Sequence, residues 1–488
     1  MAQILFFAFF LLFDSNNMSN STVTASVTFI DLATFGELEG FIYGGPHAHT
    51  WFVASVQKGN WFSFIPISLR NIGTNAQFGA CKTSYSLSRQ GDYVLSTFLR
   101  AKWPSIGFKS TVTGNCRVRF VDNLMHNLVR HVQIEFNDLV VHEFDNYWLD
   151  DNFEWRCVGQ KRQGYRNMIG DISSFTTPVG PGNSIGGGFL SLPLPFFFGE
   201  DSGIALPVAA LPFNDIKITY DFRDWKELIM VDPGTTAADV TSICTYVNGV
   251  PQDAQQPQLS CVETFAHYAI VHNDERVKMG DAPRDILIHQ VQQSQVSPFK
   301  DVSTRSSFDI RLSHAIVVFT FKASNVSLQS AFAGKYGADH SNYTTLSSVL
   351  TTPSIAGADP IQFTHLFYEN SVRLASHADY FSLVHAWYFS DAIAEKTGYH
   401  IYAYALHPWD PTRPCGSTDY SKLANVSISH DASAAAILAA QGQYEDGADI
   451  LWPTEQSAPF KQSWHHVFNA RNWNILRAAN GSIGFPSL

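Results

Sequence analysis

The stretch from Leu192 to Trp225 constrains the fold more than any other part of the sequence. Prolines at positions 193, 195, 207 and 212 remove backbone donors and exclude a central strand or a long helix from most of it. The same segment is too apolar for a solvated loop, most of all at three consecutive rings, Phe196, Phe197 and Phe198. Its side chains must therefore be buried against the chain's own domain or against a neighbouring subunit.

The end of this stretch reads as a half-buried β-strand. Apolar and polar residues alternate here, with Ile216, Ile218, Tyr220 and Phe222 at the apolar positions. The strand therefore has one apolar face and one solvent-facing polar face. Residues 93–99 and 132–136 alternate in the same way, and the second of these runs ends at an Asn-Asp pair typical of a hairpin turn. Many short strands with few helices predict β-sandwiches.

The length of 488 residues predicts more than one domain, because a single core rarely grows beyond about 250–300 residues. We expect an N-terminal extension and arm at residues 1–34, with an extended backbone over 19–34, and a first β domain at 35–230. Residues 231–258 are rich in Pro, Gly and Gln and are predicted as a linker. A second β series at 259–488 includes one clear helical run, Ser433–Gln441.

Charge and composition limit the partners. Only 15% of residues are charged, against about 25% in an average soluble protein, so we expect much of the surface to be covered by subunit contacts. The net charge is -11, and neither end carries a basic arm. Direct binding of nucleic acid is not expected, because a protein needs lysine and arginine to displace phosphate counterions.

The six cysteines are widely and irregularly spaced, at positions 81, 116, 157, 244, 261 and 415. This spacing does not predict a zinc site, and we expect free thiols in a reducing compartment. A Cys244–Cys261 bridge stays open on sequence distance alone. Residues 4–13 are apolar, but they are too short to span a bilayer and lack a preceding basic residue. We interpret residues 1–17 as an upstream extension or a short membrane-seeking tail, with a cleaved signal as the alternative and Met18 as a second possible start.

No catalytic, cofactor or metal site is predicted. Residues 182–186 match the G-x-S-x-G pattern of hydrolases, but flanking prolines and glycines prevent the strand and helix that this motif requires. The pairs His47/His49 and His465/His466 have no further ligands at suitable spacing. Six glycosylation sequons occur, and Asn342 lies in the most loop-like region, 336–360, which makes it the best glycan acceptor if the chain meets that machinery.

Several segments together resemble a known family. These are LPLPFFF, SGIALP and LPFNDIKI between residues 192 and 218, FIDLATFGELEGFIYGG at Phe29–Gly45, MHN at Met125–Asn127 and VQIEFND at Val132–Asp138. FYENSVRL, DYFSLVHAWY and TGYHIYAYAL follow between Phe367 and Leu406, then GSTDYSKLANVSI and the closing NGSIGFPSL. In family order they resemble the major capsid proteins of large icosahedral eukaryotic DNA viruses, of the iridovirus and marseillevirus type.

The resemblance implies an all-β double jelly roll, two eight-stranded antiparallel sandwiches side by side with short helices in the loops. It implies a structural protein of the virion capsid, not an enzyme, that forms homotrimeric, pseudo-hexagonal capsomers in the host cytoplasm. The implied partners are neighbouring capsomers, minor capsid proteins and possibly an inner viral membrane. The alternative from another class is a secreted or surface β-sandwich protein that binds glycans.

The three rings Phe196, Phe197 and Phe198 are candidate assembly contacts. Three consecutive side chains cannot all enter one sandwich core by alternation. We therefore expect at least one ring to leave its own core and to pack against the second sandwich or a neighbouring chain.

Overall fold

A computed structural model describes residues 25–46, 48–54, 56, 58–73, 75–234, 236–281, 283–299, 305–326, 336–345, 357–442 and 461–485. The chain divides into two units, Met1–Gly59 and Asn60–Leu488. The predicted extension at residues 1–17 lies outside the described residues. In the first unit the prediction of an extended arm is wrong over residues 25–33, which form helix α2 (Ala25–Ala33). The adjacent apolar residues Phe29 and Ile30 break the period of two that a strand requires.

Helix α3 (Glu37–Ile42) follows α2. Its capping residue is Gly36, whose backbone N–H donates to the side chain of Glu39 at 3.1 Å. The Thr34 hydroxyl donates to the carbonyl oxygen of Asp31, so the cap of α3 comes from Gly36 and Glu39.

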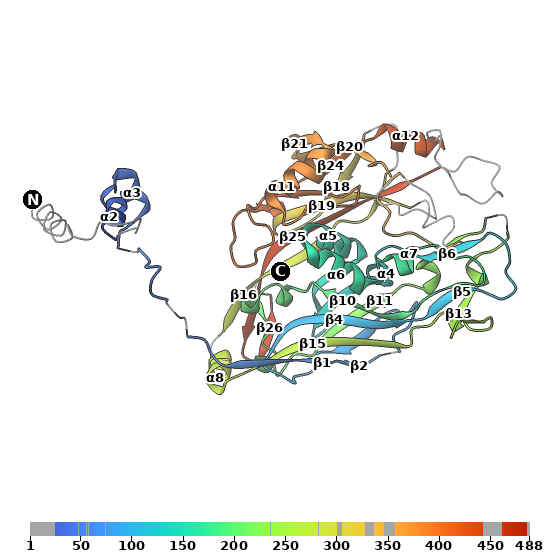
Figure 1. The fold of residues 1–488 in the computed structure, drawn as a ribbon, viewed down its shortest axis with the longest axis horizontal. Helices are drawn as coiled ribbons and strands as arrows, with labels where there is room; N and C mark the ends of the chain where they lie inside the picture. The colour runs from blue at the N-terminus through green and yellow to red at the C-terminus, as the bar shows by residue number, and fades with distance from the viewer. Residues whose placement is uncertain are drawn as a thin grey trace, which may run out of the picture. The chain divides into compact units, whose positions relative to one another are not determined.

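The second unit contains a first sandwich made of two antiparallel sheets (Figure 1). Sheet A has the order β1 (Phe62–Ser68), β15 (Cys261–Val271), β4 (Tyr93–Trp103) and β10 (Gly188–Leu194). Sheet B has the order β2 (Arg70–Asn71), β3 (Thr83–Ser86), β11 (Ile216–Phe222), β7 (Val129–Phe136) and β8 (Leu139–Asp145).

Strand alternation and turn chemistry explain these elements. Strand β11 buries Ile216, Ile218, Tyr220 and Phe222, as the sequence predicts. Strands β7 and β8 are joined by Asn137 and Asp138, both at positive φ (49° and 67°). Asn and Asp tolerate this conformation, which matches the twist of a two-residue hairpin.

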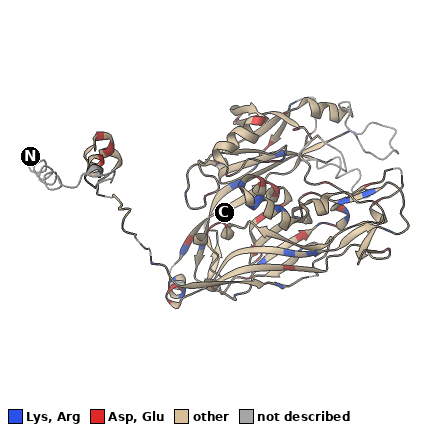
Figure 2. Cartoon of the chain, in the orientation of Figure 1, with Lys and Arg blue, Asp and Glu red and all other residues tan. Residues whose placement is uncertain are grey.

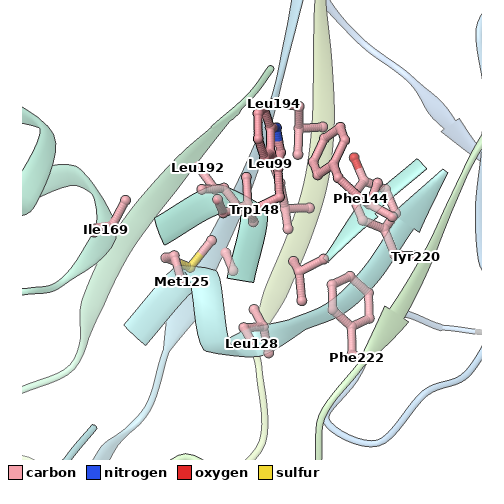
Figure 3. Close-up of a cluster of buried hydrophobic side chains, with 14 of the residues drawn as sticks. Leu99, Met125, Leu128, Phe144, Trp148, Ile169, Leu192, Leu194, Tyr220 and Phe222 are labelled. Atoms are coloured by element: carbon pink, nitrogen blue, oxygen red, sulfur yellow. The ribbon is translucent and has the colours of Figure 1, made fainter. Parts of the chain in front are cut away.

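The core of the first sandwich lies between sheets A and B (Figure 3). Leu99 and Leu192 come from sheet A, and Phe144 and Tyr220 come from sheet B. The Thr264 hydroxyl of β15 donates to the Tyr220 hydroxyl at 3.1 Å, so a polar contact also crosses the core.

Strand β15 corrects the predicted domain boundaries. The second β series is predicted to begin at residue 259, but β15 pairs with both β1 and β4 in the middle of sheet A. The predicted linker, 231–258, contains β13 (Ile243–Val247), which pairs with β5 (Ser105–Phe108) of the first half. Its Pro, Gly and Gln residues lie in turns between short strands. Such turns have the same composition as a linker.

The second sandwich is also formed by two antiparallel sheets. Sheet C has the order β16 (Arg284–Gln293), β25 (Trp464–Ala479), β19 (Ala315–Asn325) and β22 (His400–Ala403), and also holds β17 (Ser297–Pro298), β23 (Thr418–Asp419) and β26 (Ser482–Gly484). Sheet D has the order β18 (Ser306–Asp309), β24 (Val426–Ala432), β20 (Ile361–Tyr368) and β21 (Ser371–His377). Its core joins Phe319, Phe321 and Phe468 of sheet C to Leu366 and Ile428 of sheet D.

Short elements complete the second unit. Two small sheets pair β12 (Ile229–Asp232) with β6 (Arg117–Phe120), and order β14 (Val250–Gln252), β13, β5 and β9 (Ser184–Ile185). Among the described residues, its α-helices are α4 (Leu124–Leu128), α5 (Asn146–Arg156), α6 (Gln160–Ile169), α7 (Ser173–Thr176), α8 (Asn273–Asp281), α11 (His385–Phe389) and α12 (Ala434–Gln441). Element η6 (Tyr380–Val384) is a π-helix, and the 3-10 turns are η1 (Phe197–Gly199), η2 (Ser202–Ile204), η3 (Val208–Ala210), η4 (Trp225–Glu227), η5 (Val240–Ser242) and η7 (Tyr420–Lys422). The helix predicted at 433–441 is confirmed as α12, and Ser433 caps it by accepting from Ala436 N–H.

Candidate functional site

Helix α5 lies at the junction of the two sandwiches (Figure 1). Asp145 caps its N-terminus, where a carboxylate oxygen accepts a hydrogen bond from the Trp148 N–H at 2.9 Å. Most of its residues are buried, among them the acidic residues Asp150, Asp151 and Glu154. A charged helix can be buried in this way only where partners satisfy its carboxylates.

Asp151 connects α5 to sheet C. One carboxylate oxygen accepts from Lys322 Nζ at 2.8 Å, and the other accepts from the Thr320 hydroxyl at 2.8 Å and Asn469 Nδ2 at 2.9 Å. Lys322 Nζ also donates to the Tyr147 carbonyl at 2.8 Å. The ion pair is almost fully buried and joins the first sandwich to β19 and β25 of the second.

Glu200 makes a second charged connection between the sandwiches. Its carboxylate contacts Arg471 of β25, His289 Nδ1 at 3.3 Å and Arg156 at 3.3 Å. Burial would raise the pKa of Glu200, but the charge of Arg471, the hydrogen bond to His289 and the charge of Arg156 outweigh it and lower that pKa to about 2. Glu200 therefore stays ionised and holds the two sandwiches together through the whole neutral range.

Asp150 forms a third connection, on the other side of α5. It contacts His126 Nδ1 at 2.6 Å and accepts from the Tyr343 hydroxyl at 2.7 Å and the Ser341 hydroxyl at 3.1 Å. Burial opposes ionisation, yet hydrogen bonds and nearby positive charge lower the pKa of Asp150. Residues 341–343 belong to the second half of the sequence, so this network also crosses the junction.

The three networks make the junction a structural site. Figure 2 shows charged residues of both signs gathered on α5 and α6. Sequence reasoning missed these residues, although Lys322 gave a usable signal. Lys322 lies between the largely apolar run Ile316–Phe321 and Ala323. A lysine at such a position indicates a buried ion pair, because a buried ammonium group needs a partner.

The predicted assembly residues Phe196, Phe197 and Phe198 are all buried within the single chain. The chain is extended at Phe196 and turns through η1 after it, so the three rings point in different directions. Phe196 packs on Phe144 at 5.2 Å, and Phe197 meets Phe198 edge to face at 5.3 Å. Turn η1 lies against β4 of the first sandwich and β16 of the second. In the described chain these rings serve the contact between its two sandwiches and offer no exposed surface to a neighbouring chain.

Phe197→Leu tests this placement. We expect it to lower the free energy of unfolding of the single chain by about 1 kcal/mol, since the smaller side chain leaves the site underpacked. The measurement is urea unfolding together with sedimentation. A variant that unfolds like the wild type but dissociates from its neighbours more readily would restore these rings as assembly contacts.

Asn342, the predicted glycan acceptor, is buried and does not lie in an exposed loop. Its side-chain oxygen accepts from the Thr344 N–H and hydroxyl, both at 3.0 Å. The Ser- and Thr-rich composition of residues 336–345 reflects hydrogen bonding inside the fold, while residues 346–356 lie outside the described residues. Asn425 and Asn480 are the sequon asparagines that the structure shows as exposed.

The candidate catalytic and metal residues are not brought together. Ser184 lies in the two-residue strand β9, paired with β5, and not on a strand-to-helix turn. His466 stacks on Phe308 inside the second sandwich, and His47 lies outside the described residues. Across the described ranges, no group of three or more His, Cys, Asp and Glu side chains could hold a metal ion. Nor does any helix there have the length and apolarity needed to cross a bilayer.

All six cysteines are free in the structure. Titration of unfolded, unreduced protein is therefore expected to find six thiols per chain, with Cys244 and Cys261 among them. Mass spectrometry of the alkylated protein gives the same count independently. Two or more missing thiols would contradict the free state.

The comparison with protein families accounts for nearly the whole chain. Residues 50–271 match the major capsid protein N-terminus family, and residues 275–484 match the large eukaryotic DNA virus major capsid protein family. The chain is 43% identical over 483 residues to the major capsid protein of Costelytra zealandica iridescent virus, covering 97% of this chain and all of that protein. It is 37% identical to that of Lymphocystis disease virus 1, with the same coverage of both chains.

Solved structures share the fold. The PBCV-1 virus capsid model matches with a TM-score of 0.68 at 17% identity, covering 90% of this chain and all of that one. The Faustovirus major capsid protein matches with a TM-score of 0.64 at 11% identity, covering 88% of this chain and 92% of that one. The fold is the double jelly roll of viral capsid proteins. The chain belongs to the major capsid protein family of large eukaryotic DNA viruses, and it is a structural protein of the virion capsid, not an enzyme.

Proposed function

We propose that three copies of this chain form a homotrimeric capsomer with a pseudo-hexagonal outline. Each copy contributes two sandwiches, so three copies place six similar columns around a threefold axis. A hexagonal unit of this kind tiles a flat facet with a single repeated block. The domain division belongs to this proposal, with the first jelly roll ending at Val271, where β15 ends.

The observation that carries the proposal is the buried junction between the sandwiches. Lys322 and Asp151 are both almost fully buried and link the two halves at 2.8 Å. Removing one member of such a pair leaves a buried, uncompensated charge, so separation of the two sandwiches is costly. A capsomer needs this rigidity, because six columns keep a hexagonal outline only if the angle within each pair is fixed.

The partners follow from the same role. We propose neighbouring capsomers, minor capsid proteins and an inner viral membrane as contacts, with assembly in the host cytoplasm. The net charge of -11 supports protein and lipid partners over the genome. The six free cysteines fit assembly in a reducing compartment.

Electron microscopy of the purified protein tests the shape. We expect single particles with threefold symmetry and a hexagonal outline when viewed along the axis. Particles with two lobes that never associate into threefold units would contradict the proposal.

A further inference from the structure

The two sandwiches follow the same plan, which makes their sheets comparable. In sheet A the first strand of the sandwich, β1, lies beside the last, β15. In sheet C the first strand, β16, lies beside the last long strand, β25. Hairpin β7–β8 of sheet B corresponds to hairpin β20–β21 of sheet D. Both hairpins turn through two residues at positive φ, Asn137 and Asp138 in one, Glu369 and Asn370 in the other.

The helical segment after each hairpin is also equivalent. Strand β8 leads into α5, and strand β21 leads into η6 and α11. Within the chain, α5 covers the outer face of sheet C through the contacts of Asp151 with Thr320, Lys322 and Asn469. Nearly every residue of β19 is consequently buried, on both faces of the sheet.

The corresponding outer face of sheet A carries exposed aromatic rings as well as charged side chains. Strand register places Phe98 beside Phe265, and the two rings stack at a centroid distance of 5.1 Å. Both rings lie on the outer face of the sheet, opposite to the face that carries the core residue Ala266. Phe64 of β1 is 64% exposed and Phe189 of β10 is 50% exposed. An antiparallel sheet that faces water usually carries polar side chains outward, so this face has the composition of a contact surface.

The segment equivalent to α5 carries the complementary patch. Trp387 and Tyr388 of α11 are 71% and 72% exposed, and Leu383 and Val384 of η6 are about half exposed. Helix α11 packs against β22 at the edge of sheet C, and η6 also contacts β21 of sheet D. In Figure 1 both lie on the opposite side of the body from β1 and β15 of sheet A. The two patches therefore lie apart within one chain.

Charge around the two patches is also complementary. Arg100 and Lys102 lie on the outer face of sheet A, with the Arg100 guanidinium 4.2 Å from the centre of the Phe189 ring. Glu263 of β15 stands in register with Arg100, so one of the two positive charges keeps an acidic neighbour and the face stays basic by one charge. The exposed carboxylates Asp379 and Asp391 flank η6 and α11. Opposite charges at the rim favour the register in which the two patches meet.

We propose that η6 and α11 of one copy dock on the outer face of sheet A of the next copy, as α5 docks on sheet C within a chain. The contact is head to tail, because it joins different patches of identical chains, and it closes a ring when the rotation is 120°. It repeats between chains the sandwich-to-sandwich contact that exists inside each chain. This inference rests on the proposed trimer and names its interface.

Photo-crosslinking in the full chain tests the contact directly. The variant Trp387→p-benzoylphenylalanine is prepared in ¹⁴N- and ¹⁵N-labelled forms, and the two forms are mixed before irradiation. Crosslinked peptides that carry both labels come from two chains, whereas those with a single label can come from one. We expect adducts between chains at peptides that contain Phe64, Phe98, Phe189 or Phe265. Adducts with residues 25–59 would assign this patch to the N-terminal unit, and adducts confined to one chain would remove the interface; either result overturns the proposal.

Substitution gives a second readout. Trp387→Ser and Phe189→Ser are each expected to raise the concentration at which trimers dissociate about tenfold or more, with unchanged unfolding of the single chain. Phe213→Ser is the matched control, since Phe213 is 74% exposed and lies on neither patch. If the wild type is a trimer and Trp387→Ser dissociates like it, only this interface is wrong. If the wild type is never a trimer, the proposed capsomer itself is wrong.

Discussion

Lys322→Met is expected to lower the free energy of unfolding by about 3–5 kcal/mol, because it leaves the Asp151 carboxylate buried without its cation. Lys322 and Asp151 are 1% and 2% exposed, so water cannot replace the lost partner without opening the junction. Methionine keeps most of the side-chain volume, which separates the effect of charge from that of a cavity. Urea unfolding of the dissociated chain measures the loss.

The matched control is Lys322→Met combined with Asp151→Asn. Removing both charges is expected to recover most of the loss, since the isolated carboxylate is what destabilises the single variant. Thr320 and Asn469 remain beside residue 151 in both variants. A single variant that loses less than about 1 kcal/mol would show that the junction does not depend on this pair.

Stability is expected to fall steeply between about pH 6.5 and pH 4, because the cores hold neutral histidines. Burial lowers the pKa of His142 to about 4 and that of His466 to about 3. Their ordinary pKa is 6.5, so below that value the unfolded chain binds protons that the folded chain does not. This stability is complete above pH 6.5 and is lost as pH falls; His142 alone accounts for roughly 3 kcal/mol by pH 4.

His466→Phe tests the second of these histidines. The new ring can keep the stacking on Phe308, now at a centroid distance of 4.2 Å, while it removes the group that takes up the proton. We expect a flatter dependence of the unfolding free energy on pH, with little change at pH 7.5. His272→Gln, at an exposed position, is the control and should follow the wild-type curve. A wild-type curve that is flat from pH 7 to pH 4.5 would contradict the account.

Local patterns in the sequence predicted local structure well. The alternation at Ile216–Phe222 gives strand β11, the Asn137-Asp138 pair gives the β7–β8 hairpin, and Ser433 opens helix α12. The motif resemblance led to the correct family and fold because its segments run in order through almost the whole chain.

The pairing of strands that are distant in the sequence could not be predicted from such local patterns. Strand β15 has the right local pattern, but whether it joins sheet A or sheet C depends on partners more than 150 residues earlier, at β4. The burial of Asn342 was missed for a related reason. A polar segment looks like a loop whether its hydrogen bonds go to water or, as here, to Thr344.

The native mass of the purified full-length protein, followed through a dilution series, tests the central claim most directly. A capsomer of three copies predicts a particle with three times the chain mass of 54.3 kDa that persists on dilution. It also predicts that no two-chain species accumulates, because a head-to-tail ring is complete only with its third member. A protein that remains at 54.3 kDa at every concentration would contradict the account.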